Sequence, residues 1–144
     1  MVELHVERTI AAPQQLVFDW LADPANLMTA PLVLRSGWVK GIAGPGVGAS
    51  RWVLGAGLWV GDERLTGYDP PHSYDYRIVS AVPPFEHEGG RLTFTAADGG
   101  THVDWRSVYT HPRYAGGWAL EAVTSRLLRI SFAAILAGCA EALE

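Results

Sequence analysis

The sequence lacks several features that mark other classes of protein. It contains one cysteine, Cys139, which cannot form an internal disulfide, and this favours a reducing compartment and a cytoplasmic location. Charged residues make up 18% of the 144 residues, the formal net charge is −4, and the basic residues are scattered singly. Because binding to phosphates needs clustered cations, we expect no nucleic-acid partner.

Long uninterrupted apolar segments are also scarce. Glu3, His5 and Glu7 interrupt the first residues, so we expect no signal peptide. Arg126 and Arg129 interrupt the longest apolar stretch, whereas a membrane span needs ~18 apolar residues. We therefore expect no integral membrane segment.

Hydrophobic and aromatic residues are abundant. Hydrophobic residues make up 49% of the chain, which contains six Trp, five Tyr and four Phe. A chain of this length predicts a single domain, residues 1–144, with a substantial core. Bulky aromatic side chains are also suited to lining an apolar pocket.

The spacing of apolar residues predicts an α+β protein. Residues 4–10 alternate as in a half-exposed strand, Pro13 suits the first turn of a short helix that ends at Asp23 and Pro24, and residues 26–31 form a bend or a second short helix. A long apolar helix is expected over residues 117–143. Six further antiparallel strands are predicted over residues 32–40, 50–54, 58–68, 74–81, 91–96 and 101–109.

The long helix has small and hydroxylated residues where a filled core would favour bulk. Thr124, Ser131 and Gly138 fall near the centre of its apolar arc, so either a cavity forms there or a strand side chain such as Trp105 or Tyr76 fills the space. Phe132 and Leu136 fall nearer the polar side, which predicts a partner surface or a covering loop there. At ~100° per residue, the inward arc comprises Leu120, Val123, Leu127, Ile130, Ala134 and Ile135, and the opposite side Glu121, Ser125, Arg126 and Arg129.

Four segments carry a resemblance to a known family. They are residues 6–13 with 17–24, the turn at 68–74, the strand at 99–105 and the closing helix. In this order they resemble the START/Bet v1-like (SRPBCC) superfamily, in its polyketide cyclase/dehydrase-like branch. The resemblance implies a helix-grip fold, in which a curved seven-stranded antiparallel sheet wraps a long C-terminal helix around a hydrophobic cavity, with two short helices after the first strand. It implies members that bind lipids, sterols or polyketide-like aromatics, some of them cyclases or dehydratases.

The residues themselves predict a cavity that binds a small hydrophobic ligand, lipid-like or resembling an aromatic polyketide. Aromatic residues alternate along the predicted strands, and buried Tyr hydroxyls need hydrogen-bond partners. The sequence is also compatible with a homodimer. The predicted lining comprises Trp38, Trp52, Trp59, Tyr74, Tyr76, Trp105, Ser107, Tyr109, Leu120, Thr124, Leu127 and Ser131.

Two alternative functions remain open at this point. A cyclase or dehydratase would use Glu63, which shares a strand face with Leu65, or His87 as acid or base, unless Glu63 simply pairs with an arginine, Arg51 or Arg91. A protein-binding module, similar to the chaperone activators of the same superfamily, would use Phe132, Leu136 and the outer face of the sheet.

Metal and nucleotide cofactors are not expected. In a strand, His87 would point away from Glu86 and Glu88, and His102 and Asp104 would share the solvent face, so three convergent zinc ligands are missing. The glycine-rich residues 44–48 precede a strand and not a helix, which predicts a hairpin loop and no phosphate cradle.

Overall fold

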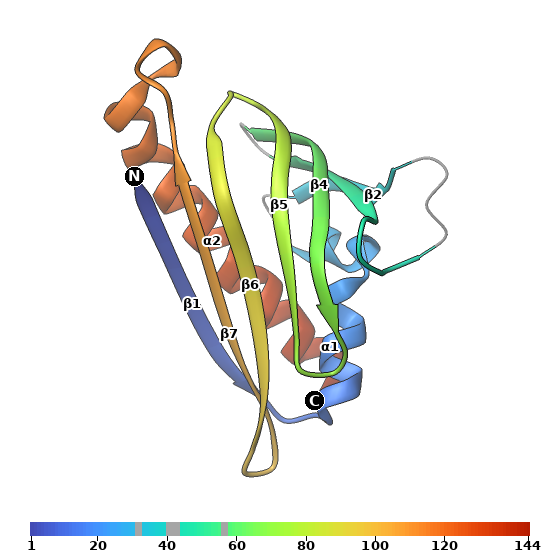
Figure 1. The fold of residues 1–144 in the computed structure, drawn as a ribbon. Helices are drawn as coiled ribbons and strands as arrows, with labels where there is room; N and C mark the ends of the chain where they lie inside the picture. The colour runs from blue at the N-terminus through green and yellow to red at the C-terminus, as the bar shows by residue number, and fades with distance from the viewer. Residues whose placement is uncertain (31–32, 40–43, 56–57) are drawn as a thin grey trace.

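Seven strands form one curved antiparallel sheet in the order β1-β7-β6-β5-β4-β3-β2 (Figure 1). The computed structural model describes residues 1–30, 33–39, 44–55 and 58–144; the predicted segments at 26–31 and 32–40 therefore lie partly outside the described residues. The strands are β1 (Val2–Ile10), β2 (Val33–Trp38), β3 (Ser50–Gly55), β4 (Leu58–Asp69), β5 (Ser73–Val82), β6 (Glu86–Ala97) and β7 (Gly100–Thr110).

The helices lie against one face of this sheet. Helix α2 (Gly117–Leu143) crosses the face diagonally, and α1 (Gln14–Ala22) lies beside its C-terminal end (Figure 1). The short 3-10 helices are η1 (Pro24–Thr29), directly after α1, and η2 (Arg113–Ala115), directly before α2. This arrangement confirms the predicted helix-grip α+β fold.

The core fills the half of the molecule that contains α1. Alternate residues of β6 and β7 point toward the helices, with Leu92 facing Trp105 and Phe94 facing Val103 across the two strands. Phe18 of α1 packs edge-on against Phe94, with ring centroids 5.0 Å apart. Ile135, Leu136 and Cys139 of α2 complete this core. The other half of the concave face is left for a cavity.

The inward face of α2 is rotated from the one that the sequence predicts. Val123 and Ile130 are 54% and 58% exposed, whereas Leu136 and Cys139, which lie outside the predicted arc, are fully buried. Leu136 is fully buried and Phe132 stacks on Trp105 with ring centroids 3.9 Å apart, so their predicted place on a partner surface is wrong. In this orientation Thr124 is hydrogen-bonded to Tyr109, and Glu121 accepts a hydrogen bond from the backbone N–H of His111.

Helix α2 is long and apolar enough, by length and composition, to cross a membrane, and it is the one such helix in the described chain. The criterion tolerates two charged residues in the helix, and a core helix that packs inside a protein also meets it. The helix nevertheless packs along the sheet with Ile135, Leu136 and Cys139 buried, as the core helix of this fold.

Strand β6 begins at Glu86, five residues before its predicted start at residue 91. A β-bulge lies between His87 and Gly89, and Gly89 has a φ of +145°, a backbone conformation that favours glycine. The early start makes His87 a strand residue with its side chain directed inward, while Glu86 and Glu88 are exposed.

Candidate functional site

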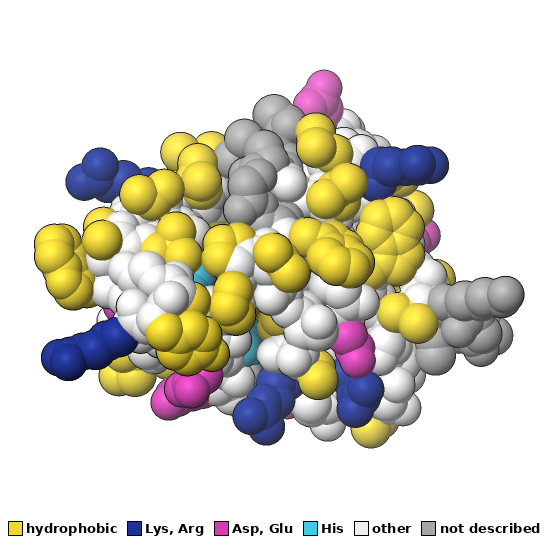
Figure 2. Space-filling model, turned by 90° about the horizontal axis from the view of Figure 1, so that it is seen from above, with side chains coloured by type: hydrophobic (Ala, Val, Ile, Leu, Met, Phe, Trp, Pro, Cys, Tyr) yellow, Lys and Arg dark blue, Asp and Glu magenta, His cyan; other side chains and the backbone are white. Residues whose placement is uncertain are grey.

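A cavity of about 110 Å³ lies between the sheet and α2. Figure 2 looks down on the end of the molecule at the top of Figure 1 and shows hydrophobic side chains gathered across it. Most of the side chains that line the cavity are apolar. The complete lining, polar residues included, consists of Leu27, Val33, Arg51, Val53, Gly55, Val60, Glu63, Tyr76, Ile78, Phe85, His87, Trp105, Ser107, Tyr109, Thr124, Leu127, Leu128, Ser131, Phe132 and Ile135.

His87 lies at the cavity wall as a fixed hydrogen-bond donor. The backbone N–H of Ile78 donates to His87 Nδ1 at 2.9 Å, and an N–H can only donate. The neutral ring therefore carries its hydrogen on Nε2 and donates it to Ser107 Oγ at 2.8 Å. Burial, with the Arg77 guanidinium in addition, lowers the pKa of His87 to about 4, so the ring is neutral at pH 7.

Tyr76 joins the same cluster. Trp105 Nε1 donates to the Tyr76 hydroxyl at 2.9 Å. The Tyr76 ring stacks on His87 with centroids 5.4 Å apart. Burial, and then the Glu63 carboxylate, raises the pKa of Tyr76. We call Tyr76, His87, Trp105 and Ser107 the β5–β7 cluster.

Gly90 makes the position of Tyr76 possible. The two residues face each other across β5 and β6, and a Cβ on Gly90 would collide with Cζ of the Tyr76 ring. The ring therefore lies flat over a strand position that has no side chain. A glycine inside a strand often marks the close approach of another group, so Gly89-Gly90 could have indicated from the sequence that a bulky side chain packs over this strand.

A buried ion pair forms another part of the wall. Arg51 donates from Nε and Nη2 to Glu63 Oε1 at 3.0 and 2.6 Å, and these two residues are 2% and 6% exposed. Burial lowers the pKa of Arg51, but the Glu63 charge, the neighbouring Tyr74 hydroxyl and the hydrogen bonds to Glu63 together outweigh it and raise that pKa. Glu63 thus has the arginine partner considered from the sequence, although the pair is buried and lines the cavity.

A third group of polar side chains connects β7 to α2. Thr124 Oγ1 lies 3.0 Å from the Tyr109 hydroxyl and 2.9 Å from His111 Nε2, and His111 Nδ1 lies 3.0 Å from the carbonyl oxygen of Pro84. A carbonyl can only accept, so Nδ1 carries a hydrogen, and in the neutral ring Nε2 accepts from Thr124. Tyr109 then donates to Thr124. We call Tyr109, His111 and Thr124 the β7–α2 cluster.

Phe85 separates the two clusters. Its ring meets Tyr109, His111 and His87 edge-on, at centroid distances of 5.3, 5.6 and 6.1 Å. It lies between two strands that the sequence predicted only in part, so nothing in the alternation pattern indicated its position.

The structure brings together nine of the fourteen side chains proposed from the sequence and places the rest elsewhere. Tyr74 is in the core, where its hydroxyl donates to the carbonyl oxygen of Leu21 at 3.1 Å, and Trp59 is 49% exposed. Trp38, Trp52 and Leu120 are also not among the lining residues. Lining the cavity are Glu63, Tyr76, His87, Trp105, Ser107, Tyr109, Thr124, Leu127 and Ser131. Arg51 and Phe85 are lining residues that the sequence analysis missed. Two residues that support the lining were missed as well, Gly90 beneath the Tyr76 ring and His111 beside Thr124.

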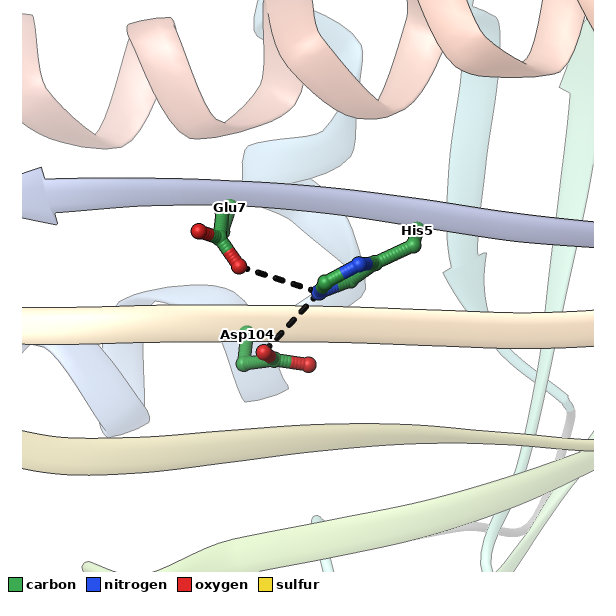
Figure 3. Close-up of side chains that lie close together, drawn as sticks. All are labelled: His5, Glu7 and Asp104. Carbon is green, nitrogen blue, oxygen red and sulfur yellow. Dashed lines mark hydrogen bonds and ion pairs between the residues drawn. The ribbon is translucent and has the colours of Figure 1, made fainter.

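A separate group of titratable side chains lies on the outer face of the sheet. His5 Nε2 lies 3.0 Å from Glu7 Oε2 and 2.9 Å from Asp104 Oδ2 (Figure 3). These three atoms are close enough to share a metal ion, but Arg106 already pairs with Asp104 at 3.1 Å, and the side chains are partly exposed. Ion pairing at the surface is a sufficient account of this group.

Comparison with known proteins agrees with this architecture. A family model described as "Polyketide cyclase / dehydrase and lipid transport" matches residues 1–144. No curated protein sequence matches the chain.

Solved structures match the fold over almost the whole chain. TTHA0849 from Thermus thermophilus has a TM-score of 0.78 and 18% identity, covering 97% of this chain and 95% of that chain. Ara h 8.0201 has a TM-score of 0.64 and 19% identity, covering 95% and 97%. DynU16, from the dynemicin biosynthetic locus, has a TM-score of 0.66 and 17% identity, covering 96% of this chain and 46% of that chain.

At these identities the solved structures establish the fold alone, and the family model establishes the relationship. Together they confirm the resemblance drawn from the sequence motifs. The chain belongs to the polyketide cyclase/dehydrase and lipid transport family, within the SRPBCC or START/Bet v1-like superfamily.

Proposed function

We propose that the protein binds a small hydrophobic ligand, lipid-like or resembling an aromatic polyketide, in the cavity between the sheet and α2. The supporting observation is the cavity wall itself, in which apolar side chains surround a few buried, hydrogen-bonded polar groups. That combination is typical of ligand sites, because apolar contact supplies affinity and the polar groups orient the ligand.

The cavity volume limits the part of the ligand that it encloses. An apolar cavity of about 150 Å³ binds benzene, so about 110 Å³ limits the enclosed part to at most one ring or a short branched chain. Each buried methylene contributes about 0.8 kcal/mol, so a six-carbon group supplies roughly 5 kcal/mol before the cost of association. A larger ligand would extend through the cavity mouth or displace side chains.

Catalysis is a second candidate, favoured by one observation. A cyclase or dehydratase needs a group at the cavity that can move a proton, and Glu63 lines the cavity. His87 does not suit this role, because its Nδ1 lone pair and its Nε2 hydrogen are both engaged in hydrogen bonds. Glu63 is therefore the residue on which a catalytic function would depend.

The protein-binding module is not proposed further. It relied on Phe132 and Leu136 as surface residues, and the structure places Leu136 in the core and Phe132 against Trp105.

Filling the cavity tests the binding proposal. Native mass spectrometry after gentle purification should reveal a co-purified hydrophobic molecule. Ser131→Leu places bulk at a lining position and should abolish toluene binding in an NMR titration. Ala133→Leu, at an exposed position two residues further along the same helix, should leave toluene binding unchanged. Unchanged toluene binding in Ser131→Leu would contradict the proposal.

A further inference from the structure

Two hydrogen-bonding valences on the cavity wall have no partner within the described chain. The first belongs to the β5–β7 cluster, which contains four hydrogens to donate: those of Trp105 Nε1, His87 Nε2 and the Tyr76 and Ser107 hydroxyls. The Tyr76 and Ser107 oxygens accept the first two. At least one hydroxyl hydrogen therefore remains, because a bond between the two hydroxyls would use only one of their two hydrogens.

The second free valence is an oxygen of Glu63. Both bonds from Arg51 go to Oε1, and no donor in the described residues bonds to Oε2. Asp62 Oδ1 is the one fully enclosed side-chain oxygen or nitrogen in that part of the chain without a partner. Glu63 Oε2 is therefore accessible, and it belongs to a residue that lines the cavity.

The two valences lie close together on one face of the sheet. Glu63 pairs with Ile78 and Leu65 pairs with Tyr76 across β4 and β5, so Glu63 and Tyr76 are diagonal neighbours. Such neighbours are separated by about 7–8 Å between their Cα atoms, within the span of two side chains and a small group between them. A single functional group of a ligand can meet both.

From this arrangement we infer that the cavity selects apolar ligands that carry a neutral hydroxyl group, a phenol or an alcohol. The ligand hydroxyl donates to Glu63 Oε2 and accepts the hydrogen left over by Tyr76 and Ser107. A carboxylate ligand is disfavoured, because Arg51 is the one cation among the described lining residues and it is already paired with Glu63. This inference rests on the proposed binding function.

Three single-ring probes of similar size separate the inference from that function. NMR titrations would give the Kd of toluene, p-cresol and p-toluate. The hydrogen bond from the p-cresol hydroxyl to the charged Glu63 carboxylate should contribute more free energy than the hydroxyl loses on leaving water, so p-cresol should bind at least about tenfold more tightly than toluene. We expect p-toluate to bind more weakly than toluene. If p-cresol and toluene bind equally, the selectivity is overturned but the cavity function stands. If none binds, both fail.

Two variants assign the selectivity to Glu63. Glu63→Gln should reduce the preference for p-cresol over toluene by at least about threefold, because the charge on the acceptor is lost. Should that variant not fold, the double variant Arg51→Met with Glu63→Leu removes both charges and keeps an apolar wall. It should bind p-cresol and toluene equally. A tenfold preference that survives in the double variant would overturn the inference.

Discussion

The two polar clusters of the cavity use the same kinds of residue but differ in how completely they are satisfied. In the β7–α2 cluster each hydrogen has an acceptor, from Tyr109 through Thr124 to His111 and on to the Pro84 carbonyl oxygen. In the β5–β7 cluster at least one hydroxyl hydrogen is left over, and Glu63 Oε2 beside it also lacks a partner in the described chain. The first cluster holds β7 to α2, and the second has capacity for a ligand.

The cost of an unsatisfied buried group explains why this difference matters. A buried polar group without a partner costs roughly 1–3 kcal/mol, so a fold keeps such groups where something else will meet them. The comparison therefore predicts that changes in the β7–α2 cluster affect stability, and that changes around Glu63 and Tyr76 affect both stability and ligand preference.

The largest effect is expected from breaking the ion pair. Glu63→Leu leaves the Arg51 guanidinium buried and unpaired, which should lower the free energy of unfolding by about 3–5 kcal/mol in urea denaturation. The double variant Arg51→Met with Glu63→Leu should recover most of that loss. A loss as large in the double variant as in the single one would show that the charge imbalance was not the cause.

Acid should destabilise the protein through His87. Its folded-state pKa of about 4 lies below the usual 6.5, so the unfolded chain binds the proton more readily. Stability is fully present above pH 6.5 and falls as the pH drops toward 4, by roughly 3 kcal/mol at most. His87→Gln should remove this part of the pH dependence in urea denaturation at pH 4 to 7. An unchanged slope in that variant would contradict the assignment.

Gly90→Ala should disturb the β5–β7 cluster by displacing the Tyr76 ring. The added methyl overpacks this site, and such insertions cost about 1–3 kcal/mol. The preference for p-cresol should fall with it. Gly61→Ala is the matched control within β4, where the nearest atoms to a new Cβ are at ordinary contact distance, 3.5 Å from the Trp59 ring. Similar losses in the two variants would argue against a specific clash.

The smallest effect on ligand preference is expected from the β7–α2 cluster. Thr124→Val has nearly the same shape but leaves the Tyr109 hydrogen and His111 Nε2 without their partner, which should cost about 1–3 kcal/mol of stability. The ratio of the Kd values for toluene and p-cresol should stay within about twofold of the wild type. A large change in that ratio would mean that the two clusters are not separate.

The sequence predicted the fold well because alternation and punctuation are local signals. The seven strands, the closing helix and the inward direction of Glu63 with Leu65 all follow from residues close together in the chain. The polar lining at Tyr76, Ser107, Tyr109 and Thr124 was proposed from the same alternation, and the structure places these side chains around one cavity.

The predictions that were wrong depend on contacts between distant segments. Trp59 and Tyr74 have the strand context of lining residues, but one is half-exposed and the other is held in the core by the carbonyl oxygen of Leu21. In the observed orientation of α2, Thr124 and Glu121 are hydrogen-bonded to Tyr109 of β7 and to His111 after it, and a helical wheel does not include such partners. His87 lies outside the strand predicted at residues 91–96, because that predicted strand begins after Gly89-Gly90.

The tryptophan side chains provide the most direct test of the cavity as the ligand site. Trp105 lines the cavity with its indole N–H donating to Tyr76, whereas Trp59 and Trp118 are 49% and 82% exposed and lie outside the lining. In a titration of the ¹⁵N-labelled protein with toluene, the account predicts that the indole signal of Trp105 shifts saturably while those of Trp59 and Trp118 stay in place. Shifts confined to Trp59 or Trp118 would contradict it.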